Sequence, residues 1–169
     1  DNVGVFDRSQ PLPGGAVLEQ ADATAWMGML CLNLLRMAVV LGKRDPVFED
    51  ACSRFFMHFL SIAEAMADFR QTGTGLWDDS DKFYYDRLRM PTGQMLPLKL
   101  RSVVGLIPLF AVEVLSSEIL DQLPVFQERL NWFFVQRPDL ASLVSRWREP
   151  AIHADGAATE VETRLFSLL

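Results

Sequence analysis

The chain has 169 residues, of which 50% are hydrophobic and 22% charged, a composition that excludes a disordered protein and can supply the core of one folded domain. Its formal net charge of −6 argues against a nucleic-acid partner, because nucleic-acid-binding surfaces concentrate lysine and arginine. No uninterrupted apolar run has the length of a membrane span, so we expect no membrane partner and a cytoplasmic location. The opening residues DNVGVFDRS lack a signal-peptide pattern, and any targeting signal is expected outside this segment.

Residues 1–21 are expected to form an irregular loop, because prolines and glycines interrupt the stretch from Pro11 to Gly15. A helix is predicted to follow, with Asp22 as its N-cap and its end before Gly42. Apolar residues occur nearly all the way around this helix, which predicts burial on most sides.

The second predicted helix has Asp45 as N-cap and Pro46 at its first position, and its apolar residues keep helical spacing to about Phe69. The connection between the two helices is short, so residues 22–70 are predicted to form an antiparallel helical hairpin. Residues 71–104 are predicted to be a loop and a small β-hairpin near 83–99, since FYYDRL and QMLPLKL flank the turn sequence PTG.

Residues 105–148 are predicted to form short helices, over 106–115, 117–123, 125–136 and 140–146, and residues 149–169 a flexible tail that ends in an apolar turn. The expected fold is mainly α, as a single domain over 1–169. Helical hairpins joined by loops suit either a bundle or an αα-barrel.

Cofactor chemistry has no clear signal in the sequence. Cys31 and Cys52 lie in apolar helical pattern and are expected to be core thiols, while His58 and His153 lack neighbours at metal-ligand spacing. The acidic run at 77–81 lacks the alternation and the closing glutamate of a calcium loop, so it is better explained as a solvated turn. We expect no metal and no cofactor.

Carboxylates and aromatic rings gather on the loops at helix starts. This mixture is typical of a carbohydrate site, where rings stack on sugar faces and a carboxyl pair performs acid and base catalysis, although loops of any helical protein contain such residues. The carboxylates are Asp1, Asp7, Glu19, Asp22, Asp78 and Asp86, and the rings are Phe6, Trp26, Trp77, Tyr84 and Tyr85.

Four segments, in order, closely resemble successive parts of the bacterial branch of glycoside hydrolase family 63, whose members are similar to mannosyl-oligosaccharide glucosidase, the processing α-glucosidase. The segments are DNVGVFDRSQPLPGG, LEQADATAWM, LWDDSDKFYYDRLRMPTG and LKLRSVVGLIPLFAVEVL. The resemblance covers about residues 1–150 and implies an (α/α)6 catalytic barrel. Because family members are far longer, it also implies that this chain is an internal piece of that barrel.

The family hydrolyses glycosidic bonds with inversion, and its general acid stands in a motif that ends Gly-x-Asp-Asn. Asp1, followed by Asn2, is therefore the candidate general acid, with Asp7 as rival; Asp7 could equally be a loop carboxylate paired with Arg8. No glutamate here matches the surroundings of the family's general base, which is expected beyond residue 169, so this chain alone is predicted to be inactive.

Substrate-binding candidates are also implied by resemblance. Related inverting barrel enzymes such as trehalases carry a Gln-Trp-Asp signature at the start of a barrel helix, which Gln20 and Asp22 match loosely, with Trp26 one turn later. The structural alternative for Asp22 is an N-cap. Trp77 and Asp78 belong to the loop that the family places over the barrel mouth.

The leading interpretation is thus a fragment of an inverting, α-glucosidase-like glycoside hydrolase that acts on oligosaccharides or α-glucosides. The alternative is a non-catalytic helical module that binds carbohydrate or protein. Uncovered barrel faces would expose apolar side chains, so self-association is also expected.

Overall fold

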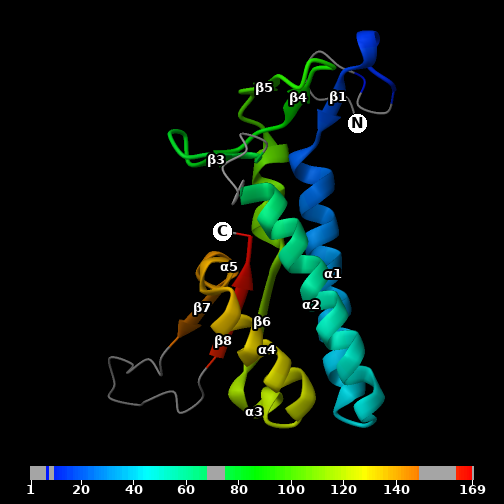
Figure 1. Ribbon diagram of the computed structural model, residues 1–169, viewed down its shortest axis with the longest axis vertical. Helices are drawn as coiled ribbons and strands as arrows, with labels where there is room; N and C mark the ends of the chain where they lie inside the picture. The colour runs from blue at the N-terminus through cyan, green and yellow to red at the C-terminus, as the bar shows by residue number, and fades with distance from the viewer. Residues whose placement is uncertain (1–6, 8–9, 68–74, 149–162, 169) are drawn as a thin grey trace.

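The computed structural model describes residues 7, 10–67, 75–148 and 163–168, and helices make up most of its regular structure. Two long helices, α1 (Ala21–Gly42) and α2 (Glu49–Ala67), run side by side along the long axis (Figure 1). The mainly α class is therefore confirmed.

The predicted hairpin of α1 and α2 is present because its connection is stopped and capped as expected. The Asp45 side chain accepts a hydrogen bond from the Val47 N–H, and a short 3-10 turn, η2 (Pro46–Phe48), leads into α2. Gly42 lies where a Cβ atom would come within 2.8 Å of the Leu123 side chain, so glycine permits close packing at this end of the hairpin. The two buried cysteines are free thiols, as predicted.

The prediction that α1 is buried on most sides was wrong. One face packs against α2, while several large apolar side chains of α1 are exposed to solvent: Trp26, Met27, Leu30, Met37, Val40 and Leu41. The apolar pattern alone could not reveal this, because it is the same for a helix that is covered on all sides.

The irregular reading of residues 1–21 was wrong in part. A 3-10 turn, η1 (Pro13–Gly15), precedes a short strand, β1 (Val17–Glu19), which pairs antiparallel with β4 (Arg87–Arg89). Three residues are too few to show a strand period, and the partner is about 70 residues away.

The predicted hairpin near 83–99 is confirmed, and it forms part of two small sheets. Strands β4 and β5 (Met95–Pro97) pair around a turn at Gly93, and with β1 they form the sheet β1-β4-β5. Strands β2 (Trp77–Asp78) and β3 (Phe83–Tyr84) pair as a separate two-residue ladder.

The helix predicted over residues 106–115 is not formed. A 3-10 helix, η3 (Val103–Phe110), is followed by strand β6 (Val112–Ser116). Gly105 and Pro108 disfavour an α-helix, and the β-branched Val112 and Val114 suit the strand.

Three short helices follow: α3 (Ser117–Leu120), α4 (Pro124–Gln136) and α5 (Pro138–Val144). The three short helices predicted here are present with shifted ends: α3 ends three residues before the predicted end at Leu123, and α5 ends two residues early, where strand β7 (Ser145–Arg148) begins.

The flexible-tail reading of residues 149–169 was wrong at its end, because Thr163–Ser167 form strand β8. β8 lies between β6 and β7 and pairs antiparallel with both. The Phe166 side chain of β8 is fully buried. Its contacts with residues far away in the chain stabilise the strand, and the polar sequence that precedes β8 gives no sign of them. Residues 149–162 lie outside the described part of the chain.

The core lies between α2 and the C-terminal elements. The Phe56 ring of α2 makes edge contacts with four other phenylalanines, at centroid distances of 5.3–6.3 Å: Phe126, Phe133, Phe134 and Phe166. The Tyr84 hydroxyl donates a hydrogen bond to the Leu168 carbonyl, which ties the β2–β3 ladder to the end of β8.

Helix α1 also bears on the membrane prediction. Among the described residues it is the one helix with the length and mean hydropathy, 1.6, to cross a membrane, and 39% of that stretch is buried. A core helix passes the same test, so the absence of a membrane partner stays a prediction.

Candidate functional site

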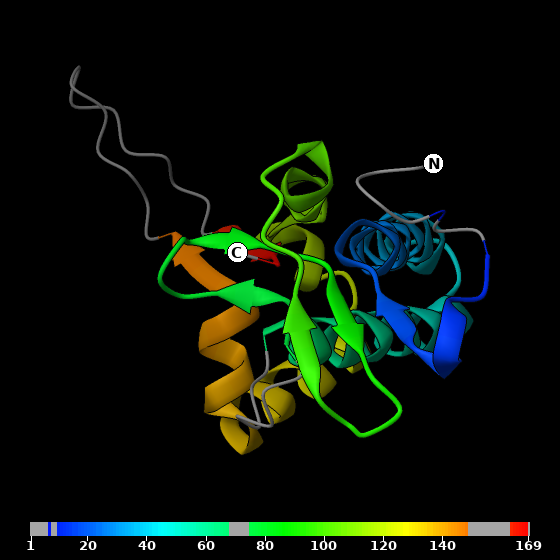
Figure 2. The ribbon, with the colours of Figure 1, turned by 90° about the horizontal axis from the view of Figure 1, so that it is seen from above.

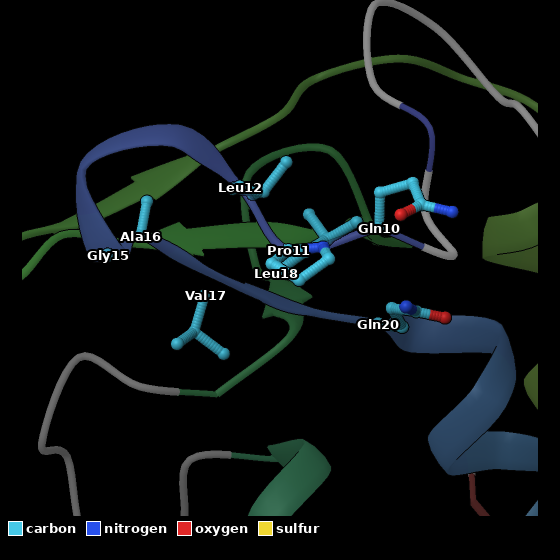
Figure 3. A pocket seen from close by; sticks show the side chains of 8 residues that line it. All are labelled: Gln10, Pro11, Leu12, Gly15, Ala16, Val17, Leu18 and Gln20. Carbon is cyan, nitrogen blue, oxygen red and sulfur yellow. The ribbon is translucent and has the colours of Figure 1, made fainter.

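A cavity of about 390 Å³ lies where the chain enters α1, and its lining includes Gln20, one of the residues that the sequence singles out (Figure 3). Its wall comes from the loop before η1, from β1 and from the residue before α1. The lining residues are Gln10, Pro11, Leu12, Gly15, Ala16, Val17, Leu18 and Gln20.

The local sequence explains the cavity. Gly14 and Gly15 adopt φ values of 71° and 76°, which only glycine reaches easily, and they turn the chain so that residues 10–12 fold back beside β1. β1 is fixed in turn by its pairing with β4.

The cavity is neutral and amphipathic. Figure 3 shows the amides of Gln10 and Gln20 at one end, with Ala16 and Val17 at the other. Among the described lining residues none is charged. Amide groups both donate and accept hydrogen bonds, so the lining suits a neutral ligand with hydroxyl groups and an apolar face.

Gln20 is the one predicted site residue that lines this cavity in the described structure. It is the N-cap of α1, and its backbone carbonyl accepts a hydrogen bond from the Thr24 hydroxyl at 2.6 Å, which fixes the residue beside the cavity. Gln10 had no signal in the sequence, because it becomes a neighbour of Gln20 only after the glycine turn forms.

Asp22 lies in the first turn of α1, so the N-cap reading was wrong by two positions. Its carboxylate accepts a hydrogen bond from the Ala23 N–H at 2.7 Å. The first N–H of α1, on Ala21, instead donates to the Asp86 carboxylate at 2.7 Å. A side chain from the β-hairpin thus caps α1, which no local pattern predicts.

Trp26 lies one turn further along α1 and is 43% exposed. Its ring stacks on that of Phe110 in η3, with centroids 5.9 Å apart and planes 19° apart. Its apolar contact is therefore with η3, and the Trp26 side chain is not among the described residues that line the cavity.

Trp77 and Asp78 belong to a separate network in the β2–β3 loop. The Asp78 carboxylate accepts hydrogen bonds from the Ser80 and Asp81 N–H groups and forms an ion pair with Lys99 at 2.8 Å. The pKa of Asp78 is therefore well below its usual range, chiefly because of the hydrogen bond from Lys99. The Trp77 indole donates to Asp79.

Of the acid candidates, Asp1 lies outside the described residues. Asp7 is exposed, and its carbonyl accepts a hydrogen bond from the Gln10 N–H at 3.2 Å, which places it three residues before the cavity lining. Glu19 forms an ion pair with Arg89 across the β1-β4 pair, at 2.8 Å.

Metal chemistry has little support in the described part of the chain. There, no group of three or more His, Cys, Asp or Glu side chains is placed to hold a metal ion. His58 is exposed on α2, and His153 lies outside the described residues.

Comparison with known proteins gives one informative match. Over 151 residues the chain is 42% identical to a protein of Saccharomyces cerevisiae, Uncharacterized protein YMR196W, and the match covers 83% of this chain. The chain spans 14% of the length of that relative. No family model matches the chain, and no solved structure matches it.

Proposed function

We propose that this chain is part of an inverting glycoside hydrolase, similar to α-glucosidases, and that the cavity at the start of α1 contacts a sugar unit. The observation that carries the proposal is the neutral cavity that Gln10 and Gln20 line. Its volume of about 390 Å³ is at the lower end of the range of small-molecule sites, which suits a single sugar ring.

The chemistry of the lining favours a sugar over a charged ligand. Two amides can bond to hydroxyl groups, and the apolar side chains of Pro11 and Leu18, which lie together in Figure 3, can face the C–H side of a pyranose ring. A phosphate or carboxylate ligand would need a cationic partner, and the described lining offers none.

Catalysis in this proposal needs two carboxyl groups on opposite sides of the glycosidic bond. Asp1 is the proposed general acid, with Asp7 as its rival, and the general base is a glutamate outside these 169 residues. The relative in yeast is long enough to hold such a residue, since the chain spans only 14% of it. The (α/α)6 barrel is likewise proposed, with the α1–α2 hairpin as one of its helical pairs.

A second candidate is a module that binds carbohydrate without catalysis. The observation that favours it is the same cavity, whose described lining includes no carboxylate.

Binding is tested first, on this chain. Titration with glucose, maltose and mannobiose, followed by NMR, is expected to shift the backbone signals of Gln10, Val17 and Gln20. The Gln20→Ala variant should bind at least tenfold more weakly. Gln136→Ala, at an exposed glutamine on α4, is the matched control and should bind as wild type does. Equal binding by both variants would exclude this cavity as the sugar site.

Hydrolysis is tested next, in a longer polypeptide that includes this chain. A panel of α-glucosides and α-mannosides should include one that is cleaved with inversion, as the anomer first formed shows by NMR. Asp1→Asn should lower the rate by about a hundredfold or more. If the Asn variant keeps its rate, Asp7→Asn is tested in the same way. If no glycoside is cleaved but sugars bind, the non-catalytic module is correct.

A further inference from the structure

Five positions of α1 form a straight seam along its exposed side: Trp26, Leu30, Asn33, Met37 and Val40. They are spaced by alternating steps of four and three residues, which is the spacing of a coiled-coil seam. The four apolar members are 43% to 60% exposed. A spacing of this kind indicates a surface that packs against another helix.

Much of the rest of α1 is occupied, although Met27 and Leu41, beside the seam, are also exposed. Buried residues such as Leu32, Leu35 and Val39 pack in the core with α2, and η3 lies alongside α1, as Figure 2 shows. Trp26 marks the boundary with η3 through its stacking on Phe110. Among the described residues η3 covers part of Trp26, and the other three apolar members of the seam are 44% to 60% exposed.

We propose that this seam binds the same seam of a second copy of the chain, with the two α1 helices antiparallel and a two-fold axis at Asn33. In this register Trp26 faces Val40 of the second copy, and Leu30 faces Met37. Trp26 and Val40 lie seven residues on either side of Asn33, and Leu30 and Met37 lie three and four residues from it, so a self-complementary pairing brings each apolar residue close to an apolar residue of the second copy.

Charge complementarity selects the antiparallel arrangement. Asp22 lies at the start of α1, and Lys43 and Arg44 follow its end, both exposed. Antiparallel helices bring each acidic start beside the basic end of the other copy, while parallel helices would bring like charges together. Asn33 meets its own copy at the axis, and a single polar residue within an apolar seam fixes the register.

Two other occupants compete with a second copy: the rest of a longer polypeptide, since the chain spans 14% of its yeast relative, and a lipid surface, since α1 is apolar enough to enter a membrane. Two contacts argue against full insertion. One face of α1 packs on α2, and Arg36, in the second half of the helix, is held by Glu113 of β6. The surface that remains exposed consists of the seam and the neighbouring Met27 and Leu41.

Disulfide trapping tests the register. Asn33→Cys places two thiols at the axis, so mild oxidation should give a covalent dimer. Leu30→Cys should not couple to itself, because antiparallel copies place these residues about 9 Å apart along the axis. It should couple to Met37→Cys when the two variants are mixed. Met27→Cys, at a residue that is 52% exposed but off the seam, is the control and should give no covalent dimer. Wild type shows whether the buried native cysteines themselves form a disulfide under the same oxidation.

Light scattering from about 1 to 200 µM tests the association itself. Wild type should change from monomer to dimer, and Met37→Glu should weaken the dimer by at least tenfold while its circular dichroism is unchanged. Val135→Glu, at a 75% exposed valine on α4, should dimerise as wild type does. The proposal is overturned if the chain is monomeric throughout, if Leu30→Cys couples to itself as well as Asn33→Cys does, or if vesicles bind the chain and Met37→Glu abolishes that binding without affecting any dimer.

Discussion

Arg36 of α1 binds Glu113 of β6 through two parallel hydrogen bonds, from Nε at 3.2 Å and from Nη2 at 2.6 Å. The same Nη2 also donates to the Val114 carbonyl at 2.8 Å. The Glu113 side chain is 10% exposed and the Arg36 side chain 41%, so this partly buried pair fixes the β6 strand against the long helix. It links two elements that are 77 residues apart in the chain.

Removing the guanidinium should destabilise the fold. Arg36→Ala is expected to lower the free energy of unfolding by about 1–2 kcal/mol, less than for a fully buried pair because the Arg36 side chain is 41% exposed. Urea denaturation measures the change. Arg54→Ala is the matched control, because Arg54 and Asp50 form an exposed pair one helical turn apart, and exposed pairs contribute much less to stability. Equal losses in the two variants would contradict this account.

The cap that Asp86 provides predicts a second effect. Asp86→Ala removes the acceptor for the Ala21 N–H and should cost about 1 kcal/mol, the usual value for loss of a helix cap. Relative to wild type, hydrogen exchange in Asp86→Ala should be faster in the first turn of α1 and nearly unchanged at the centre of the helix. Glu118→Ala, at an exposed glutamate on α3, should leave both measurements unchanged. A loss spread evenly over α1 would argue against a capping role.

Alkaline pH should destabilise the protein through Cys52. Burial, and secondly the nearby Glu49 carboxylate, raise the pKa of this thiol to about 11, from 9.0. Because the folded pKa is the higher one, the stabilising contribution is complete below pH 9 and is lost as pH rises toward 11. The fall in unfolding free energy is on the order of 2 kcal/mol.

Cys52→Ala isolates this contribution. The substitution leaves a small cavity and lowers stability at every pH, but it should make the dependence between pH 9 and 11 shallower. Denaturation at several pH values measures the slope. An unchanged slope would assign the alkaline loss to other groups, first of all Tyr84, whose burial raises its pKa to about 12.

The Lys99 ammonium should control two carboxyl groups. Its hydrogen bonds are the largest cause of the lowered pKa of both Asp78 and Asp81. Lys99→Met should therefore raise both pKa values. The stability from these lowered pKa values is present above the usual aspartate range and is lost as pH falls through the folded values, so the variant should be less stable at neutral pH and lose less on acidification.

Lys82 offers a matched control for this prediction. It forms an ion pair with Asp79 at 3.1 Å and is the largest cause of the lowered pKa of that residue. Carboxyl-carbon NMR titration of Lys82→Met should show a higher pKa for Asp79 and a nearly unchanged pKa for Asp78. In Lys99→Met, the pKa of Asp78 should be higher and that of Asp79 nearly unchanged. If both variants shift all three residues alike, the loop acts as one network.

Local signals predicted the elements that local interactions determine. The α1–α2 hairpin, the Asp45 cap and helix α4 follow from helical spacing, proline and glycine positions, which depend on residues only a few positions apart. The prediction failed where a distant partner decides. β1 depends on β4, and β6 and β8 depend on each other across about 50 residues.

The candidate site shows the same division. Gln20 was singled out from the sequence, and it lines the cavity. Its partner Gln10 and the helix cap Asp86 are placed by the glycine turn and the β-hairpin, and neither carries a motif. The assignments of Asp1, Asp7, Asp22, Trp26, Trp77 and Asp78 to a sugar stay predictions.

The order of the strands in the sheet β6-β8-β7 constrains how the protein matures during synthesis. The central strand, β8, leaves the ribosome last, so β6 and β7 have no partner in this sheet until Thr163–Ser167 have been made. The α1–α2 hairpin can form long before that moment, but the contact between the Phe56 and Phe166 rings forms only after β8 has been made. A premature stop before residue 163 therefore leaves β6 and β7 without β8 and with open strand edges, which expose the truncated form to quality-control proteases and to aggregation.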